Sequence, residues 1–178
     1  MKALVLAAFL AVLVSPTASG KEPRLNNLLV HGKGFIFGVK EPDGWLGETQ
    51  GADRIAANVF FLRPKESISN AAALIRVRVI GKTDENVAAD LRADMDGYQS
   101  GFPGIKFRDL RVEHPTYVVA AKLFFVPGKF YEYVVYVNPG SGKSLAFAVS
   151  MNKQKCEATS AELSTLRAVV SSLAMLSS

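Results

Sequence analysis

From residue 34 onward, the chain contains several short segments that are rich in apolar residues, and in some of them apolar and polar residues alternate. In the clearest run, Arg76 and Arg78 alternate with β-branched residues, a pattern typical of a strand with one face in water. The last three runs are separated by only three and five residues. These links are too short for parallel crossovers and predict antiparallel hairpins. The pattern thus predicts strands at 34–39, 55–62, 73–80, 106–112, 117–126, 130–138 and 144–151, the last four forming a meander.

Two segments carry apolar residues at helical spacing instead. The first follows Thr83 and two acidic residues, where a hydroxyl group caps free amides and negative charge favours the positive end of the helix dipole. The second begins with Thr159 and Glu162, the two side chains of a capping box. The order of strands and helices predicts a single α+β domain over residues 34–178, an antiparallel meander flanked by helices.

The first twenty residues have the pattern of a secretory signal peptide. Lys2 precedes an unbroken apolar run at 3–14, and Pro16 and the small residues 18–20 supply a helix breaker and a cleavage site. The apolar run is too short to span a membrane, which takes about 20 residues. We therefore expect export with removal of residues 1–20, an irregular segment at 21–33, and no stable membrane insertion of the mature protein.

Composition adds mainly exclusions. The chain has 178 residues, of which 49% are hydrophobic and 21% charged, as in ordinary globular proteins. Its one cysteine cannot form an intramolecular disulfide, and with two histidines it cannot complete a Cys/His zinc cluster. The net charge of +5 is small and dispersed along the chain, which argues against nucleic-acid binding. We expect no cofactor, no metal and no nucleic-acid partner.

Several residues suggest chemistry but have simpler interpretations. Residues 138–144 are similar to a phosphate-binding loop, yet Val137 stands where its first glycine belongs and a strand pattern follows, so we predict a hairpin turn. Asp90 and Asp94 lie one helical turn apart and are interpreted as a solvated helix face. His114 is interpreted as a loop histidine, and Cys156 as a structural or incidental thiol.

Four basic residues are the most informative surface group. Arg76 and Arg78 lie two positions apart and share one face of their predicted strand, as do Lys106 and Arg108 in theirs. If the two strands are near each other in the sheet, the four side chains form a cationic patch for an anionic partner. The alternatives are pairing with the acidic helix and plain solvation. These four residues are the candidate partner-binding site.

Three segments carry a family resemblance. Residues 35–37 run into Pro42-Asp43-Gly44-Trp45, residues 131–138 form a Tyr-rich strand before a Gly-rich turn, and residues 165–173 form a terminal helix. In these features the chain resembles the PsbP/Mog superfamily, including its bacterial PsbP-like and DcrB-like periplasmic members. The resemblance implies an α/β/α sandwich and a docking role without catalysis. Pro42, Gly44 and Trp45 are interpreted as a structural turn.

The export signal, the rejected catalytic motifs and the resemblance together suggest a function. We expect a bacterial periplasmic or secreted, non-enzymatic protein, a monomer or weak dimer, that binds or helps assemble another envelope protein. The aromatic runs at 123–125 and 130–133 suggest an alternative, a carrier of a small apolar ligand or lipid. A third possibility is a hydrolase, for which His114 or an aspartate must face a cleft.

Overall fold

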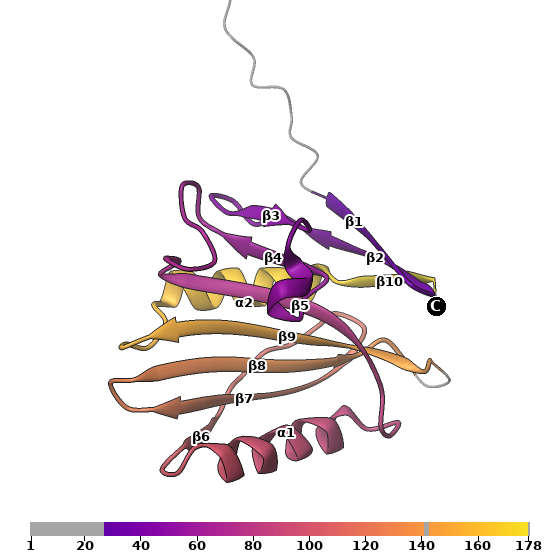
Figure 1. The fold of residues 1–178 in the computed structure, drawn as a ribbon. Helices are drawn as coiled ribbons and strands as arrows, with labels where there is room; N and C mark the ends of the chain where they lie inside the picture. The colour runs from indigo at the N-terminus through magenta and orange to yellow at the C-terminus, as the bar shows by residue number, and fades with distance from the viewer. Residues whose placement is uncertain (1–26, 141–142, 178) are drawn as a thin grey trace, which may run out of the picture.

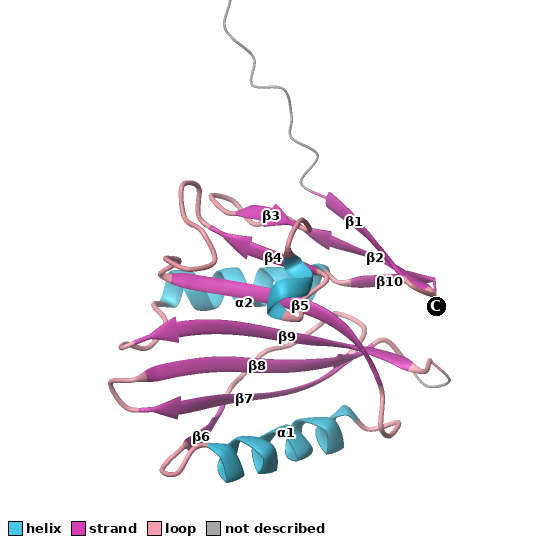
Figure 2. Ribbon diagram, viewed as in Figure 1, coloured by secondary structure: helices cyan, strands magenta, loops and turns pink. Residues whose placement is uncertain are grey.

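The structure, a computed structural model, describes residues 27–140 and 143–177. The predicted leader at 1–20 and the first part of the segment 21–33 lie outside the described residues. Figure 1 and Figure 2 show the elements, which are β1 (Asn27–Gly32), β2 (Phe35–Lys40), β3 (Leu46–Glu48), the 3₁₀ turn η1 (Ala52–Ile55), β4 (Val59–Leu62), β5 (Ala73–Gly81), α1 (Val87–Gly101), β6 (Lys106–Asp109), β7 (Val118–Val126), β8 (Phe130–Asn138), β9 (Leu145–Gln154), α2 (Ser160–Ser172) and β10 (Ala174–Ser177).

Seven strands form one antiparallel sheet in the order β3-β4-β5-β9-β8-β7-β6. Strands β6 to β9 follow one another as the predicted meander, and β9 then pairs with β5, which joins the two halves of the sheet. A second, three-stranded sheet has the order β1-β2-β10. Together with the two helices, these sheets confirm the mixed α+β class.

The main hydrophobic core lies on one face of the large sheet, here called the inner face. Side chains at odd positions, such as Val135 and Val149, point to this face and pack with Leu166 of α2. The small sheet covers the same face, because the rings of Phe37 in β2 and Phe147 in β9 meet edge to face at 5.3 Å between centroids. The inner face is thus sealed by α2 and by the small sheet.

The opposite, outer face is covered in two separate places. Helix α1 packs Leu91 against Phe124 and Val134 of the meander. At the other end of the sheet, Ala52 of η1 packs with Phe60 of β4. A helix therefore lies on each side of the sheet, and the middle of the outer face lies between α1 and η1 (Figure 1).

Three strands are absent from the prediction: the short β3, and two strands of the small sheet, β1 and β10. The segment 21–33 was expected to be irregular, but Asn27–Gly32 form β1 and pair with β2 throughout. After α2 the chain forms β10, which pairs with the other edge of β2. Neither segment alternates apolar and polar residues clearly, and Leu29 is exposed. Their strand conformation follows from the hydrogen bonds that β2 supplies, a non-local cause that periodicity does not report.

The helix starts show one success and one error. Thr159 and Glu162 form the predicted capping box, with both reciprocal hydrogen bonds present. For α1 the predicted cap Thr83 is wrong, because the side chain of Asn86 accepts the hydrogen bond from the amide of Ala88. Asparagine is as good a cap as a hydroxyl residue. The chain between Thr83 and Asn86 leads into the helix without belonging to it.

The turn that delivers Trp45 joins the small sheet to β3. The amide of Trp45 donates to the carbonyl of Pro42 at 3.0 Å, and Gly44 adopts φ of +75°, a conformation that side-chain-bearing residues rarely take. Trp45 is 6% exposed and belongs to the main core. The guanidinium of Arg63 lies 5.5 Å from the centroid of its ring, so the indole is held between the core and a cation.

Candidate functional site

A small polar pocket lies on the outer face of the sheet between η1 and α1. Its floor is β9, where the short side chains of Ala148 and Ser150 leave room above the strand. Its walls are the arginines of β5 on one side and α1 with β8 on the other. The cavity volume is about 180 Å³ and the lining includes Ala56, Arg76, Arg78, Asp94, Tyr98, Glu132, Val134, Tyr136, Ala148 and Ser150.

A hydrogen-bonded ion pair crosses this pocket. Arg76 on β5 reaches over β9 to Glu132 on β8, with 2.7 Å between Nη2 and Oε1. The same guanidinium donates to the Ser150 hydroxyl at 2.9 and 3.1 Å and to the carbonyl of Ile55 at 3.3 Å. Glu132 is buried, and a buried carboxylate is stable only when it is paired and hydrogen-bonded. Arg76 meets that need and is itself fixed in position.

Two tyrosines complete the polar network from the α1 side. The hydroxyl of Tyr98 donates to Oε2 of Glu132 at 2.5 Å, and the hydroxyl of Tyr136 donates to Oδ2 of Asp94 at 3.2 Å. Burial, reinforced by the neighbouring carboxylates, raises the pKa of both phenols well above the ordinary value. They therefore stay protonated and act as hydrogen-bond donors.

Asp94 is the least satisfied acid of the pocket. Burial raises the pKa of its carboxyl group above the ordinary value, and the negative charge of Glu132 adds to this. The hydrogen bond from Tyr136 and the charge of Arg76 oppose the increase but do not cancel it. The interpretation of Asp90 and Asp94 as a solvated face is wrong for both, because Asp90 is 8% exposed and one of its oxygens accepts from the amide of Thr83. Both acids face the sheet, because the face of α1 that carries them packs toward β8.

The structure does not bring the predicted basic patch together. Arg76 and Arg78 lie on β5 and point to the outer face, whereas Lys106 and Arg108 lie on the edge strand β6, which is separated from β5 by the three strands β9, β8 and β7. Arg108 pairs in register with Leu123, a residue of the inner core, so the side chains of Lys106 and Arg108 point to the opposite face. The four residues therefore form no common surface, and a single patch is excluded.

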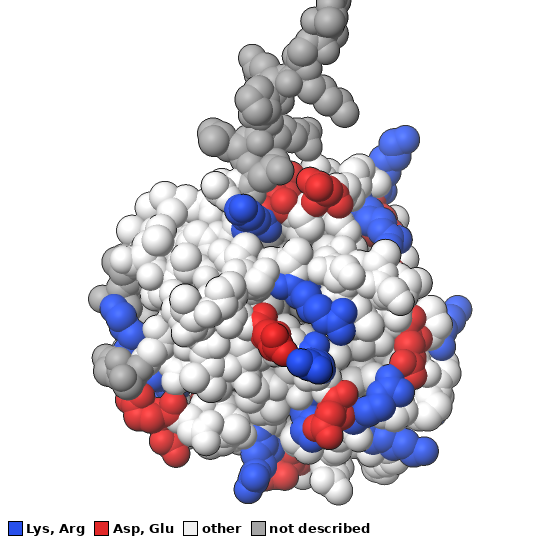
Figure 3. All heavy atoms as spheres, turned by 180° about the vertical axis from the view of Figure 1, so that it is seen from behind, with Lys and Arg blue, Asp and Glu red and all other residues white. Residues whose placement is uncertain are grey.

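Two of the four charges are also neutralised. Arg76 pairs with Glu132, and Arg108 pairs with Glu157 while lying 5.6 Å from the ring centroid of Phe125. On the side of the molecule shown in Figure 3, basic and acidic residues are interspersed rather than gathered by sign. An anionic partner therefore finds no extended positive field there.

The remaining predicted sites have structural surroundings. Nδ1 of His114 accepts from the amides of Thr116 and Tyr117, so its Nε2 carries the proton and donates to the carbonyl of Leu173 at 2.9 Å. Both ring nitrogens are thus engaged: Nδ1 accepts hydrogen bonds within the loop, and Nε2 joins the loop to the end of α2. Cys156 is exposed and free. After the loop at 138–144 the chain enters strand β9, whereas a phosphate-binding loop leads into a helix.

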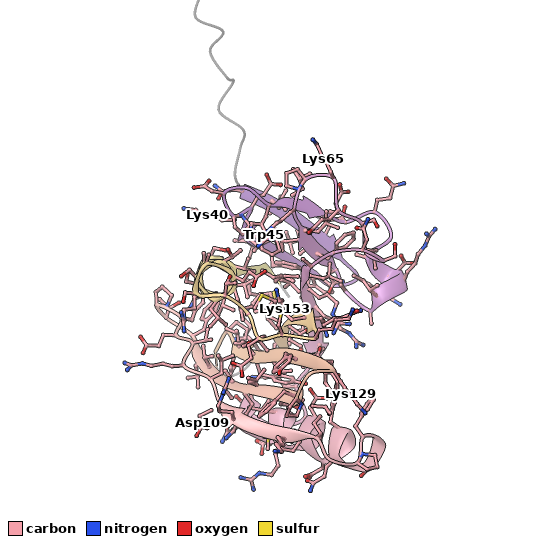
Figure 4. All side chains as sticks on the ribbon, turned by 90° about the vertical axis from the view of Figure 1, so that its left-hand side faces the viewer. Lys40, Trp45, Lys65, Asp109, Lys129 and Lys153 are labelled. Carbon is pink, nitrogen blue, oxygen red and sulfur yellow. The ribbon has the colours of Figure 1, made fainter. Side chains whose placement is uncertain are left out.

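A second ion-pair cluster, on the inner side of the sheet, is not predicted by the sequence pattern. Nζ of Lys153 lies 2.9 and 3.0 Å from the two carboxylate oxygens of Glu162, and Arg63 approaches the same carboxylate at 3.1 Å. Figure 4 shows Lys153 within the molecule, whereas Lys65 and Asp109 project from its surface. The sequence signal for Glu162 was the capping box, but nothing local indicates that Lys153 turns inward beside it.

The pKa of Glu162 reflects these contacts. Burial by itself would raise it, but the hydrogen bond from Lys153, the hydrogen bonds from Thr159 and the positive charge of Lys153 together lower it below the ordinary value. This cluster, formed by Arg63, Lys153, Thr159 and Glu162, joins the residue after β4, strand β9 and the start of α2. Its central pair, Lys153 and Glu162, is buried, with side chains 7% and 2% exposed.

Comparison with known proteins gives no family for this chain: no family model matches it, and no curated protein does. Within residues 27–140 and 143–177, no group of three or more His, Cys, Asp or Glu side chains is placed to hold a metal ion. None of the described helices combines the length and the apolar character needed to cross a membrane.

Proposed function

We propose that this chain is an exported, non-enzymatic binding protein that contacts another component of the bacterial envelope through the polar pocket of its outer face. The observation that supports this most directly is the fixed geometry of the pocket. Arg76 and Tyr98 both bind Glu132 and fix its position in the space between η1 and α1. Groups that are already ordered lose little conformational entropy on binding.

The surroundings of Ser150 favour binding over hydrolysis. A serine nucleophile needs an adjacent base to accept its proton. The neighbour of Ser150 is the guanidinium of Arg76, which donates two hydrogen bonds to the serine oxygen. Glu132 is a poor base for this purpose, because Arg76 and Tyr98 already occupy its two oxygens.

The carrier alternative depends on two aromatic runs, and most of their side chains are buried. Leu123 and Tyr133 are at most 2% exposed and belong to the inner core, and Phe124 is fully buried beneath α1. These side chains pack with each other and with the helices, which explains why the residues at these positions are apolar. A separate apolar ligand is not needed to explain them.

Site-specific photo-crosslinking in intact cells tests the proposed function. A photoreactive amino acid at position 78 lies at the rim of the pocket, and the same residue at position 106 probes the opposite face as a matched control. We expect one dominant crosslinked envelope protein from position 78 only, with yield reduced by Glu132→Gln. Equal yields from both positions, or none from position 78, would contradict the proposal.

Export is tested separately by the N-terminus of the protein recovered from cells. Cleavage near Gly20 predicts a first residue close to Lys21, read by mass spectrometry of the intact chain. A protein that retains residues 1–20 and stays in the cytoplasm would contradict export, and with it the proposed contact with an envelope component.

A further inference from the structure

Two charged groups in the pocket can accept further hydrogen-bond or ion-pair partners. Arg78 is exposed and makes no hydrogen bond or ion pair within the described part of the chain. On the other side of the pocket, the carboxylate of Asp94 has a single hydrogen-bond donor there, the hydroxyl of Tyr136. The other charges, Arg76 and Glu132, neutralise each other.

The sheet register places Arg78 and Tyr136, the hydrogen-bond donor to Asp94, on opposite sides of one small residue. Arg78 on β5 pairs with Ala148 on β9, and Ala148 pairs with Tyr136 on β8. Adjacent strands are about 4.8 Å apart, so the backbones at 78 and 136 are separated by about 10 Å. Between them Ala148 contributes only a methyl group. The space above Ala148 therefore has a free cation at one end and a carboxylate at the other.

We propose that this pocket binds a small zwitterion, a molecule carrying one ammonium and one carboxylate group. The ammonium lies against Asp94 and the hydroxyl oxygens of Tyr98 and Tyr136, and the carboxylate lies against Arg78. The hydroxyl of Ser150, whose oxygen accepts from Arg76, has its own proton available for the carboxylate. This inference goes beyond the proposed function, which concerns an envelope partner, and adds a small ligand bound in the same pocket.

Size and charge both support this class. The cavity of about 180 Å³ has the volume of about six water molecules and is smaller than the 300–1,000 Å³ typical of sites for drug-sized ligands. A lone cation would leave Arg78 unpaired, and a lone anion would bring a second negative charge toward Asp94 and Glu132. A zwitterion satisfies both free groups and adds no net charge to a half-buried site.

Three matched probes test the charge requirement on the full mature chain by isothermal titration and NMR. L-alanine carries both groups, N-acetyl-L-alanine lacks the ammonium, and L-alaninamide lacks the carboxylate. We expect saturable binding of L-alanine and at least tenfold weaker binding of the other two. Equal binding of all three, or no saturable binding of L-alanine, would overturn the inference.

Two variants assign the ends of the ligand. Asp94→Asn should weaken L-alanine binding at least tenfold but leave the weak binding of N-acetyl-L-alanine unchanged. Arg78→Gln should also weaken L-alanine binding at least tenfold, but leave the weak binding of L-alaninamide unchanged. Lys106→Gln removes one positive charge from the opposite face and is the control, with unchanged affinity. Thermal unfolding of each variant shows whether a loss of binding is a loss of fold. Failure of these titrations while position 78 still crosslinks a partner refutes the zwitterion and leaves the proposed function intact.

Discussion

The two ion-pair clusters of this protein use the same chemistry on opposite faces of one sheet, yet they differ in what they leave free. On the inner face, the side chains of Lys153 and Glu162 are 7% and 2% exposed. On the outer face, Arg76 is 29% exposed while Glu132 is 6% exposed. The inner pair is closed over by α2, whereas the outer pair lines the walls of an accessible pocket.

The difference follows from what packs above each pair. Glu162 is part of the first turn of α2, so the helix that supplies the carboxylate also covers it. Above Arg76 the nearest elements, η1 and α1, stand apart, and the small residues Ala148 and Ser150 fill little of the space. An ion pair of the same kind therefore stabilises the fold on one face and orders a binding surface on the other.

The largest expected effect is on the inner side, at the aromatic residue that closes the core. Trp45→Ala should lower the free energy of unfolding by about 3–5 kcal/mol, because a large buried side chain is lost and a cavity remains. Chemical denaturation followed by circular dichroism measures this. A loss below about 1 kcal/mol would mean that the indole contributes little to the core.

The buried pair should show the next largest effect. Lys153→Met leaves the carboxylate of Glu162 buried with only Arg63 and Thr159 as partners, and should cost about 3 kcal/mol. Adding Glu162→Gln removes the uncompensated charge, so the double variant should be more stable than Lys153→Met alone. A double variant as unstable as the sum of the two single variants would show that the two side chains are not coupled.

On the outer face the corresponding change should cost less. Glu132→Gln keeps an oxygen for Arg76 and leaves the guanidinium within reach of water, so we expect a loss of about 1–2 kcal/mol in unfolding free energy. Measured beside Lys153→Met in the same buffer, it tests the comparison directly. If Glu132→Gln is the more destabilising of the two, the outer pair is structural and the pocket is not an open site.

The pH dependence of stability should have opposite signs on the two faces. Glu162 has a lowered pKa in the folded protein, so its stabilising contribution is complete at neutral pH and is lost as the pH falls below about 4.3. Asp94 has a raised pKa, so its ionisation destabilises the fold at neutral pH and this penalty disappears as the pH falls toward about 3.9.

Denaturation of matched variants from pH 7 to pH 3 separates the two contributions. Glu162→Gln should be less stable than the natural chain at pH 7, with a difference that narrows in acid. Asp94→Asn should be at least as stable at pH 7, and its advantage should vanish in acid. Curves of the same sign for both variants would contradict the assigned environments.

The smallest effect is expected for the exposed cations. Arg78→Gln and Lys106→Gln each remove a charge without an ion pair among the described residues, and stability should change by no more than about 0.5 kcal/mol. Thermal unfolding is sufficient to check this. A larger loss at Arg78 would indicate a contact that also limits its availability to a ligand.

Local pattern was a good guide wherever a residue and its neighbours in sequence decide the outcome. Alternation predicted the strand at 73–80, found as β5 at Ala73–Gly81, and the side chains of Thr159 and Glu162 predicted the start of α2. It failed for β1 and β10, whose strand conformation depends on pairing with β2. It also misplaced Asp94, since helical spacing does not reveal which polar residue a sheet will meet.

The candidate site illustrates the same limit. Arg76 and Arg78 were recognised as a pair on one strand face because they lie two residues apart, a purely local relation. Their separation from Lys106 and Arg108 depended on the position of β6 at the far edge of the sheet. The other members of the pocket, Tyr98 and Glu132, carried no local signal that distinguishes them from core residues.

The sequence by itself determined the class of fold, the meander, the capped last helix and the expectation of export, because each of these depends on spacing within a short segment. Only the tertiary structure decided that Arg76 meets Glu132, 56 residues away. The reason is the insertion of β9 between β5 and β8, which depends on the total free energy of packing rather than on any local preference. The positions of α1, α2 and η1 on that sheet decided that the pair Lys153–Glu162 is buried and that the pair Arg76–Glu132 lines a pocket.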